Sequence, residues 1–246
     1  MVNILLGQQG DYTKYPCFLC LWDSRADEVH WKKKNSPVRQ RLAVGEKNTI
    51  NEPLVSRDRI ILPPLHIKFG LMKQFVKALN KDGTCFNYLC SVYRGLSREN
   101  LKAGIFDGPQ IRKLIKDEDF ASHMTGVEAA TWYSFVDVVN GFLGNTKVAN
   151  YQNLVEGMLK NFHSLGTRMS TTLHCLYSHL ERFPENLGDL SEEQGERFHQ
   201  DIRTMEEQFK WSLVIFWIFL SSNARMYQHS ISNLFQPHLM TLDRRR

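Results

Sequence analysis

The stretch KYPCFLCLWDSR, residues 14–25, holds two cysteines, Cys17 and Cys20, with two residues between them. Two thiolates at this spacing can bind one zinc ion from a tight turn, and a structural zinc takes four ligands, usually sulfur or imidazole nitrogen. Without two further ligands, the pair is equally well explained as two small buried residues or as a free dithiol. The source of the missing ligands therefore decides whether this stretch ties distant parts of the chain together.

The stretch HCLYSH, residues 174–179, offers His174 and His179 as further ligands. Five positions along a straight α-helix rotate the chain by about 140°, which points the two rings in different directions. One metal ion can reach both rings only if the helix ends or is distorted between them. His66 is a rival ligand, because it lies where a proline-rich irregular stretch enters a predicted helix. On spacing alone, both sources stay open.

The composition is that of a globular protein with a sizeable core. Hydrophobic residues make up 42% of the 246-residue chain, and the net charge of +5 permits contact with nucleic acid without requiring it. The cysteines number five, an odd count that argues against a disulfide framework. The opening residues, MVNILLGQQG, lack the basic region of a signal peptide. We therefore expect a nuclear or cytoplasmic protein rather than a secreted one.

The apolar run WSLVIFWIFL, residues 211–220, is 10 residues long. A membrane-spanning helix needs roughly 20. We therefore expect a buried or aberrant helix there and no membrane contact. Residues 210–246 show no amphipathic period, so we expect this divergent tail to pack poorly against the rest of the chain.

Helical patterns dominate after residue 64, so the chain is predicted to be mainly α with few strands. Pro109 suits the first position of a helix, and Gly144 and Gly166 suit helix ends. Helices are predicted at 65–79, 109–117, 127–144, 150–166 and 170–183, and from Ser191 onward.

One strand is predicted at residues 2–6, VNILL. A lone strand would bury unpaired backbone groups, so it needs a partner. Either SRDRIIL, residues 56–62, supplies the partner, or the rest of the sheet precedes residue 1. We expect the second arrangement, in which the chain is the C-terminal part of something longer.

Basic residues gather in the irregular region, residues 26–64, with Trp22 and Trp31 nearby. Loops rich in lysine, arginine and aromatic residues can track phosphates and stack bases. Ordinary solvation of a loop explains the same pattern. The candidate nucleic-acid-binding residues are Lys32, Lys33, Lys34, Arg39, Arg41, Arg57 and Arg59.

The stretch SEEQGERFHQDI, residues 191–202, is predicted to form a helix whose apolar stripe includes Phe198. Glu196 lies nearly opposite that stripe. It is either a solvated surface residue or a metal-binding carboxylate projected from a helix beside a sheet.

The order of Cys17-x2-Cys20, His174-x4-His179 and Glu196 resembles the core of RNase H-like cut-and-paste transposases, particularly the Transib-like group that includes the catalytic subunit of the V(D)J recombinase. The resemblance implies that the cysteines and histidines bind one structural zinc; His66 stays the reserve ligand, on its position in the sequence alone. The resemblance also implies that this zinc ties a helical insertion to the core and that Glu196 is a catalytic carboxylate. Relatives of full length would cut and join DNA with Mg²⁺.

A second likeness rests on GLMKQFVKALNKDG, GIFDGPQI, SHLERFPENLG and SEEQGERFHQD, and covers about residues 2–207. These stretches are similar to an uncharacterised family found in many dispersed copies in animal genomes, as mobile-element products are. The two catalytic aspartates of such transposases have no counterpart here, since Asp11 and Asp23 lie in the wrong places.

The two likenesses together imply a transposase-derived fragment, the C-terminal part of an RNase H-like α/β core with a large helical insertion. Its expected divisions are 1–64, a partial core edge; 65–170, the insertion; 171–209, the zinc-histidine segment and the Glu196 helix; and 210–246, the tail. We expect DNA as a partner and no catalysis. The alternative is a zinc-stabilised helical interaction module that binds protein partners.

Overall fold

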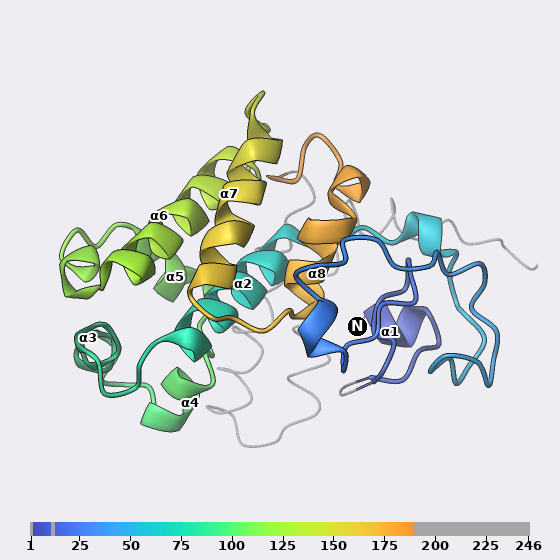
Figure 1. Ribbon diagram of the computed structural model, residues 1–246, viewed down its shortest axis with the longest axis horizontal. Coiled ribbons are helices and arrows are strands. Elements are labelled where there is room, and N and C mark those ends of the chain that lie inside the picture. Colours follow the sequence, from blue (N-terminus) through green and yellow to red (C-terminus); the bar gives the residue numbers. More distant parts are fainter. Residues whose placement is uncertain (1, 11–12, 189–246) are drawn as a thin grey trace, which may run out of the picture. The chain divides into compact units, whose positions relative to one another are not determined.

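A computed structural model describes residues 2–10 and 13–188 of the chain (Figure 1). Within these residues the protein is mainly α, as the sequence predicted, and the only β pairing is two isolated bridges, Gln8–Thr49 and Cys20–Val38. The helices are α1 Val2–Leu5, α2 Pro64–Ala78, α3 Thr84–Val92, α4 Arg98–Lys102, α5 Gly108–Ile115, α6 Gly126–Gly141, α7 Tyr151–Ser164 and α8 Thr171–Ser178.

Local signals set the helix ends. Helix α5 begins at a capping box, in which Asp107 and Gln110 satisfy each other's backbone N–H groups. Pro109 is therefore the second helical residue, one position later than predicted. Helix α7 ends at Ser164, and Gly166 follows just past the helix end with φ +82°, the left-handed conformation that suits glycine there. Helix α6 ends at Gly141, three residues before the predicted Gly144.

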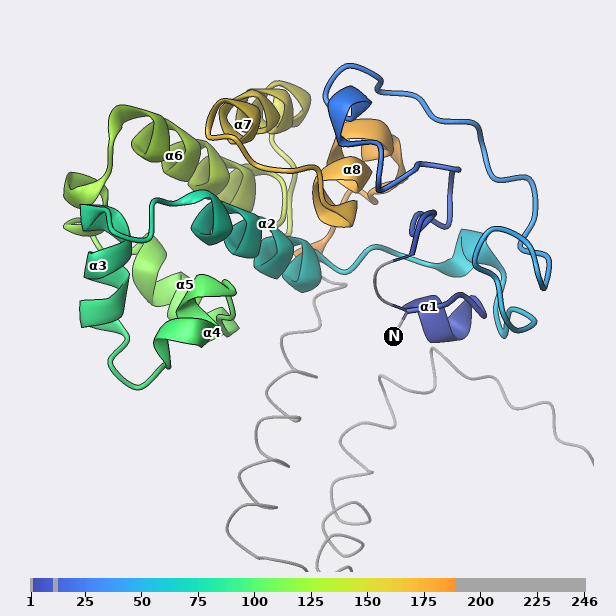
Figure 2. The same ribbon diagram turned by 60° about the horizontal axis from the view of Figure 1, so that its bottom comes forward.

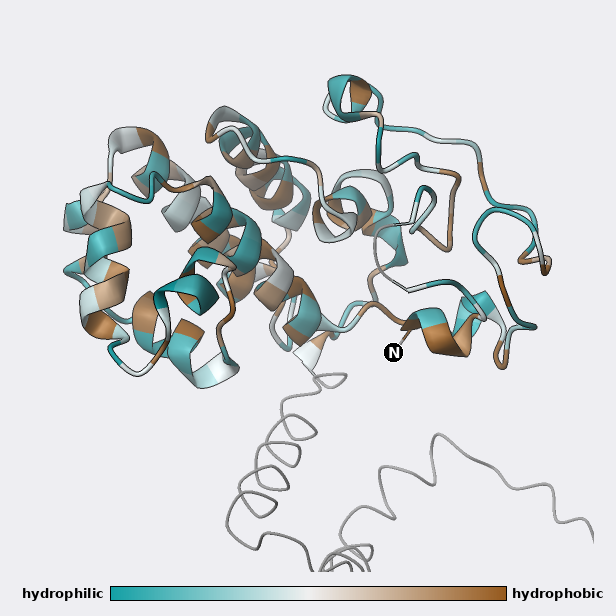
Figure 3. Cartoon of the chain, turned by 90° about the horizontal axis from the view of Figure 1, so that it is seen from below, coloured by the Kyte–Doolittle hydropathy of each residue, from teal (hydrophilic) through white to brown (hydrophobic). Residues whose placement is uncertain are grey.

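The helices from α2 to α8 share one aromatic core. The Trp132 ring of α6 lies 5.4 Å from Phe75 of α2 and 4.9 Å from Phe120, in edge-to-face geometry with the second. Helices α6 and α7 form the most extensive helix pair, and α2 packs against both α6 and α8 (Figure 2). Hydrophobic and hydrophilic residues alternate around these helices, as amphipathic packing requires (Figure 3).

Two predictions for the N-terminal segment, residues 2–62, are wrong. The stretch predicted as a strand at 2–6 is helical, because it satisfies its donors locally: Leu6 N–H donates to the Val2 carbonyl at 3.1 Å. The proposed partner stretch, 56–62, contains a 3₁₀ turn at Arg57–Arg59 and no ladder. Short apolar runs do not distinguish helix from strand, and no neighbouring strand among the described residues offers the alternative pairing.

This segment and helices α2–α8 belong to one compact unit, Met1–Glu193. None of the described helices has the length and apolar character needed to cross a bilayer. The predictions for Glu196, for the apolar run at 211–220 and for the tail at 210–246 fall outside the described residues.

Candidate metal centre

A narrow turn presents the two cysteines. The Arg39 amide donates to the Leu19 carbonyl at 3.0 Å, and the Leu21 amide donates to the Pro37 carbonyl at 2.8 Å. These two bonds flank the Cys20–Val38 bridge and close the chain around the cysteines. Both Cys17 and Cys20 are buried, so their sulfur atoms face the protein interior.

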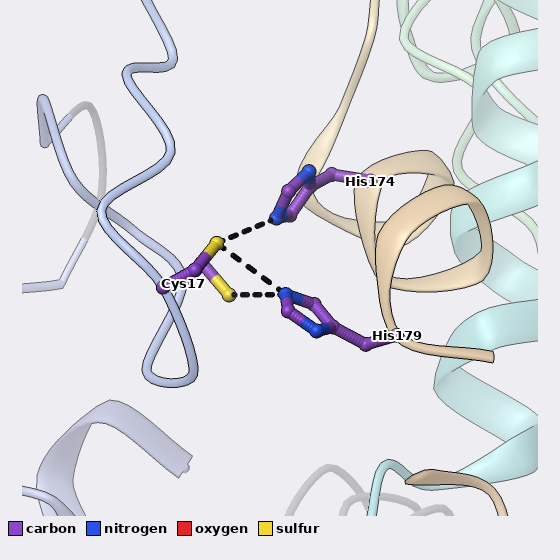
Figure 4. Close-up of side chains that lie close together, drawn as sticks. Cys17, His174 and His179 are labelled. Carbon is purple, nitrogen blue, oxygen red and sulfur yellow. Dashed lines mark hydrogen bonds between the residues drawn. The ribbon is translucent and has the colours of Figure 1, made fainter. Parts of the chain in front are cut away.

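Helix α8 presents the two histidines. Ser170 caps its first turn by accepting a hydrogen bond from the Leu173 amide, and the helix ends at Ser178. His179 follows with φ −137° and ψ 34°, outside the helical region. The helix end that a shared metal requires therefore lies between His174 and His179, and both rings turn toward the cysteines (Figure 4).

The four side chains converge. The Cys20 sulfur lies 3.2 Å from His174 Nε2 and 3.3 Å from His179 Nε2, and the Cys17 sulfur lies 3.5 Å from His179 Nε2. All four ligand atoms lie within 4.8 Å of one another. A tetrahedral zinc, with Zn–S of about 2.3 Å and Zn–N of about 2.0 Å, places sulfur and nitrogen about 3.5 Å apart. The cluster could therefore hold one metal ion.

The convergence is difficult to explain by hydrogen bonds alone. His179 Nε2 is close to both sulfur atoms, yet one ring nitrogen offers either one proton or one lone pair. A cation at the centre would satisfy every lone pair at once. The reserve ligand, His66, is exposed at the start of α2 and is not part of the cluster.

The surroundings shield the cluster from water. The indole ring of Trp22 stacks on the His174 ring, with centroids 4.4 Å apart and an angle of 7° between planes. Trp22 also contacts the buried His30, at 5.0 Å between ring centroids. Trp22 therefore fixes the plane of one candidate ligand.

The surroundings favour ionisation of one thiol of the pair, that of Cys17. A hydrogen bond from Cys20, assisted by His174 and His179, lowers the pKa of Cys17 far below that of an ordinary cysteine, although burial opposes the shift. The same hydrogen bond, together with burial, raises the pKa of Cys20. A bound cation would favour ionisation of both thiols, which is the form that binds metal.

The burial of Arg39 contradicts the prediction that this side chain contacts DNA. It is 2% exposed and donates hydrogen bonds to the carbonyls of Tyr15, Cys17 and Lys47, at 3.0, 3.2 and 3.1 Å. A guanidinium buried in this way cannot reach phosphate. Its N–H groups instead stabilise the turn that carries Cys17 and Cys20, which we call the cysteine turn. Arg57, which is half-buried, donates in turn to the Arg39 carbonyl.

The other basic candidates are exposed: Lys32, Lys33, Lys34, Arg41 and Arg59. The Arg41 guanidinium forms an exposed ion pair with Glu46 at 3.1 Å. The backbone of Lys34, the last of three consecutive lysines, is held beside α8, because the Ser178 hydroxyl donates to the Lys34 carbonyl at 2.6 Å. The three lysines form the basic turn, residues 32–34.

No acidic candidate among the described residues is a member of the metal-binding cluster. The Asp23 carboxylate pairs with Lys14 at 3.3 Å and is not a member of the cluster. Asp11 and Glu196 lie outside the described residues. Sequence reasoning assigned Trp22 and Arg39 to a nucleic-acid-binding loop and passed over Ser178, so it missed the support that all three give to the centre. Of these only Ser178 left a local signal, since it lies four positions after His174 on the same helix face.

Two family models match the chain, each in part. Residues 1–55 match a domain of unknown function (DUF8703), and residues 64–144 match a domain of unknown function (DUF8704). No curated protein and no solved structure matches it significantly. The first match contains both cysteines, and the second begins where α2 begins. The two histidines lie beyond both matches, so the candidate metal centre joins the first matched region to α8.

Proposed function

We propose that the chain is a transposase-derived protein whose helical region is clipped to its N-terminal segment by one structural zinc. The observation that carries this proposal is the convergence of Cys17, Cys20, His174 and His179 from the two ends of the described chain. Two sulfur and two nitrogen ligands suit zinc, and four protein ligands leave no position for substrate. The centre would therefore stabilise the fold rather than perform chemistry.

The RNase H-like origin is part of the same proposal. It rests on the order of the motifs: a cysteine pair, a long helical region, then two histidines at the end of a helix. In this proposal, α2–α7 are the helical insertion and residues 2–62 are the edge of the core.

DNA binding through the basic turn is the function that we propose for the exposed surface of this region. Reversing the charge of Lys32, Lys33 and Lys34 to glutamate should weaken duplex DNA binding. The slope of log affinity against log salt concentration should become shallower by about three, because each phosphate contact contributes about 0.9. Fluorescence anisotropy over a series of salt concentrations measures both quantities.

The matched control reverses three exposed lysines of the helical region, Lys102, Lys113 and Lys116. Both triple variants change the net charge equally, so a local contact affects only the first. An equal loss in the two variants would assign the affinity to net charge and remove the basic turn from the proposal.

A second candidate function, a zinc-stabilised module that binds protein partners, is favoured by the N-terminal segment. Ile4 and Leu54 are each 73% exposed, and the Leu54 amide donates to the Leu5 carbonyl, which places Leu54 beside the end of α1. The side-chain amides of Gln8 and Asn48 are meanwhile buried without a hydrogen-bond partner. Absence of any salt-dependent DNA affinity would favour this function.

We also propose that the chain does not cleave DNA. Two-metal cleavage needs several carboxylates around the ion pair, and Glu196 is the only matched catalytic carboxylate. Incubation of supercoiled DNA with the full chain and Mg²⁺ or Mn²⁺ should therefore give no nicking, for the natural chain and for Glu196→Gln alike. Nicking that disappears in Glu196→Gln would contradict this expectation and would direct attention to Asp11 and Asp23.

A further inference from the structure

The hydroxyl of Ser178 lies between two partners, and only one arrangement of protons satisfies both. Its oxygen is 2.6 Å from the Lys34 carbonyl oxygen and 3.3 Å from His174 Nδ1. A carbonyl oxygen can only accept, so the single hydroxyl proton is donated to Lys34. The Ser178 oxygen must then accept from His174, which places a hydrogen on Nδ1.

That assignment decides what the other ring nitrogen offers. A neutral imidazole with its hydrogen on Nδ1 carries a lone pair on Nε2. His174 Nε2 is the atom that lies 3.2 Å from the Cys20 sulfur, within the cluster. Metal-binding histidines are commonly oriented in this way, through a hydrogen bond from the nitrogen that does not bind the metal.

The same hydroxyl also fastens the basic turn. Besides Ser178, the Tyr177 hydroxyl donates to the Trp31 carbonyl at 3.2 Å, and the Trp31 indole donates to the Thr167 carbonyl at 3.2 Å. The backbone of the basic turn is thus anchored to α8 and to the loop that precedes it. Ser178 is the residue that connects this anchor to a candidate metal ligand.

We propose that Ser178 is a positioning residue of the metal centre. It holds His174 in the tautomer that presents Nε2 to the metal, and it couples the centre to the conformation of the basic turn. The inference rests on the proposed metal centre, but it makes a separate prediction about the protonation of one ring.

The test compares Ser178→Ala with Ser134→Ala, a control on α6 whose half-buried hydroxyl donates to the Thr131 carbonyl far from the cluster. Zinc affinity, measured by competition with a chromogenic chelator, should fall about 10- to 100-fold in Ser178→Ala. It should stay unchanged in Ser134→Ala. A Co²⁺ spectrum that keeps its thiolate bands would show that both cysteines still bind the metal, and visible d–d bands of unchanged intensity would show that the site stays tetrahedral.

A second readout isolates the tautomer. In the metal-free full chain labelled with ¹⁵N-histidine, His174 should show hydrogen on Nδ1, and Ser178→Ala should shift it toward hydrogen on Nε2. If Ser178→Ala does not fold, Ser178→Thr and Ser178→Val provide a pair of equal volume, in which only Thr should keep the natural affinity and tautomer. Unchanged zinc affinity in Ser178→Ala or Ser178→Val, or an unchanged tautomer, would overturn the proposal. If the natural chain binds no zinc, the metal centre fails, whereas the tautomer measurement still decides the role of Ser178.

Discussion

Replacing Cys17 and Cys20 with alanine should reduce bound zinc from one per chain to none and should release the N-terminal segment from α8. The effect is expected to be the largest of any substitution, because binding of a structural zinc is coupled to folding and amounts to about 10–16 kcal/mol in small zinc domains. We expect residues 13–39 to depend on the centre, since their only helix is a three-residue 3₁₀ turn, Asp27–Val29. Elemental analysis by mass spectrometry measures the zinc.

Limited proteolysis measures the release. Trypsin should cut the double variant rapidly within the basic turn, whereas α2–α7 should resist it, because Trp132 packs on Phe75 and Phe120 away from the cysteines. Cys90→Ala is the matched control, since Cys90 is a half-buried free thiol outside the cluster. Full zinc content in the double variant would show that the cysteines do not hold the metal. Unchanged resistance of the basic turn to trypsin would show that the centre does not hold this turn against α8.

Arg39→Ala should be the second most damaging substitution. Removal of the guanidinium leaves three carbonyls without their donors, those of Tyr15, Cys17 and Lys47. Each buried group left unsatisfied costs about 1–3 kcal/mol. We expect the free energy of unfolding of the zinc-loaded chain to fall by about 3–5 kcal/mol, as measured by urea denaturation.

Arg41→Ala is the natural comparison, because the same type of residue lies two positions away with a side chain that is 75% exposed. Its ion pair with Glu46 is a surface pair, worth less than about 1 kcal/mol. Arg39→Lys should recover little of the loss, since lysine keeps the charge but not the planar fork of donors. Equal effects of Arg39→Ala and Arg41→Ala would mean that the buried guanidinium does not support the cysteine turn.

Several features of the fold follow from short windows of sequence. Apolar spacing predicted α2, α6 and α7, and Gly166 predicted the end of α7, because periodicity and end capping act within a few residues. The motif at residues 174–179 also carried a geometric condition: two histidines five positions apart require a break in the helix to share a metal. His179 meets that condition by lying just past the last helical residue.

Other features depend on tertiary structure. Most of the VNILL run is helical, over Val2–Leu5, and among the described residues no strand lies beside it, which no local signal reveals. Arg39 looked like part of an exposed basic loop, and only packing of the cysteine turn against residues 37–39 buries it.

The candidate metal centre could be predicted from the sequence in part. The sequence by itself supplied the residue types and the spacing within each half of the site, since a cysteine pair and a histidine pair are local patterns. Only the tertiary structure decided that the halves meet, across the 154 positions between Cys20 and His174, and that His66 is left out. The contacts of the His174 ring with the Trp22 ring and the Ser178 hydroxyl likewise appear only in the tertiary structure. The physical reason is that convergence at this separation is set by the packing of α8 against α2 and α7, which no short stretch encodes.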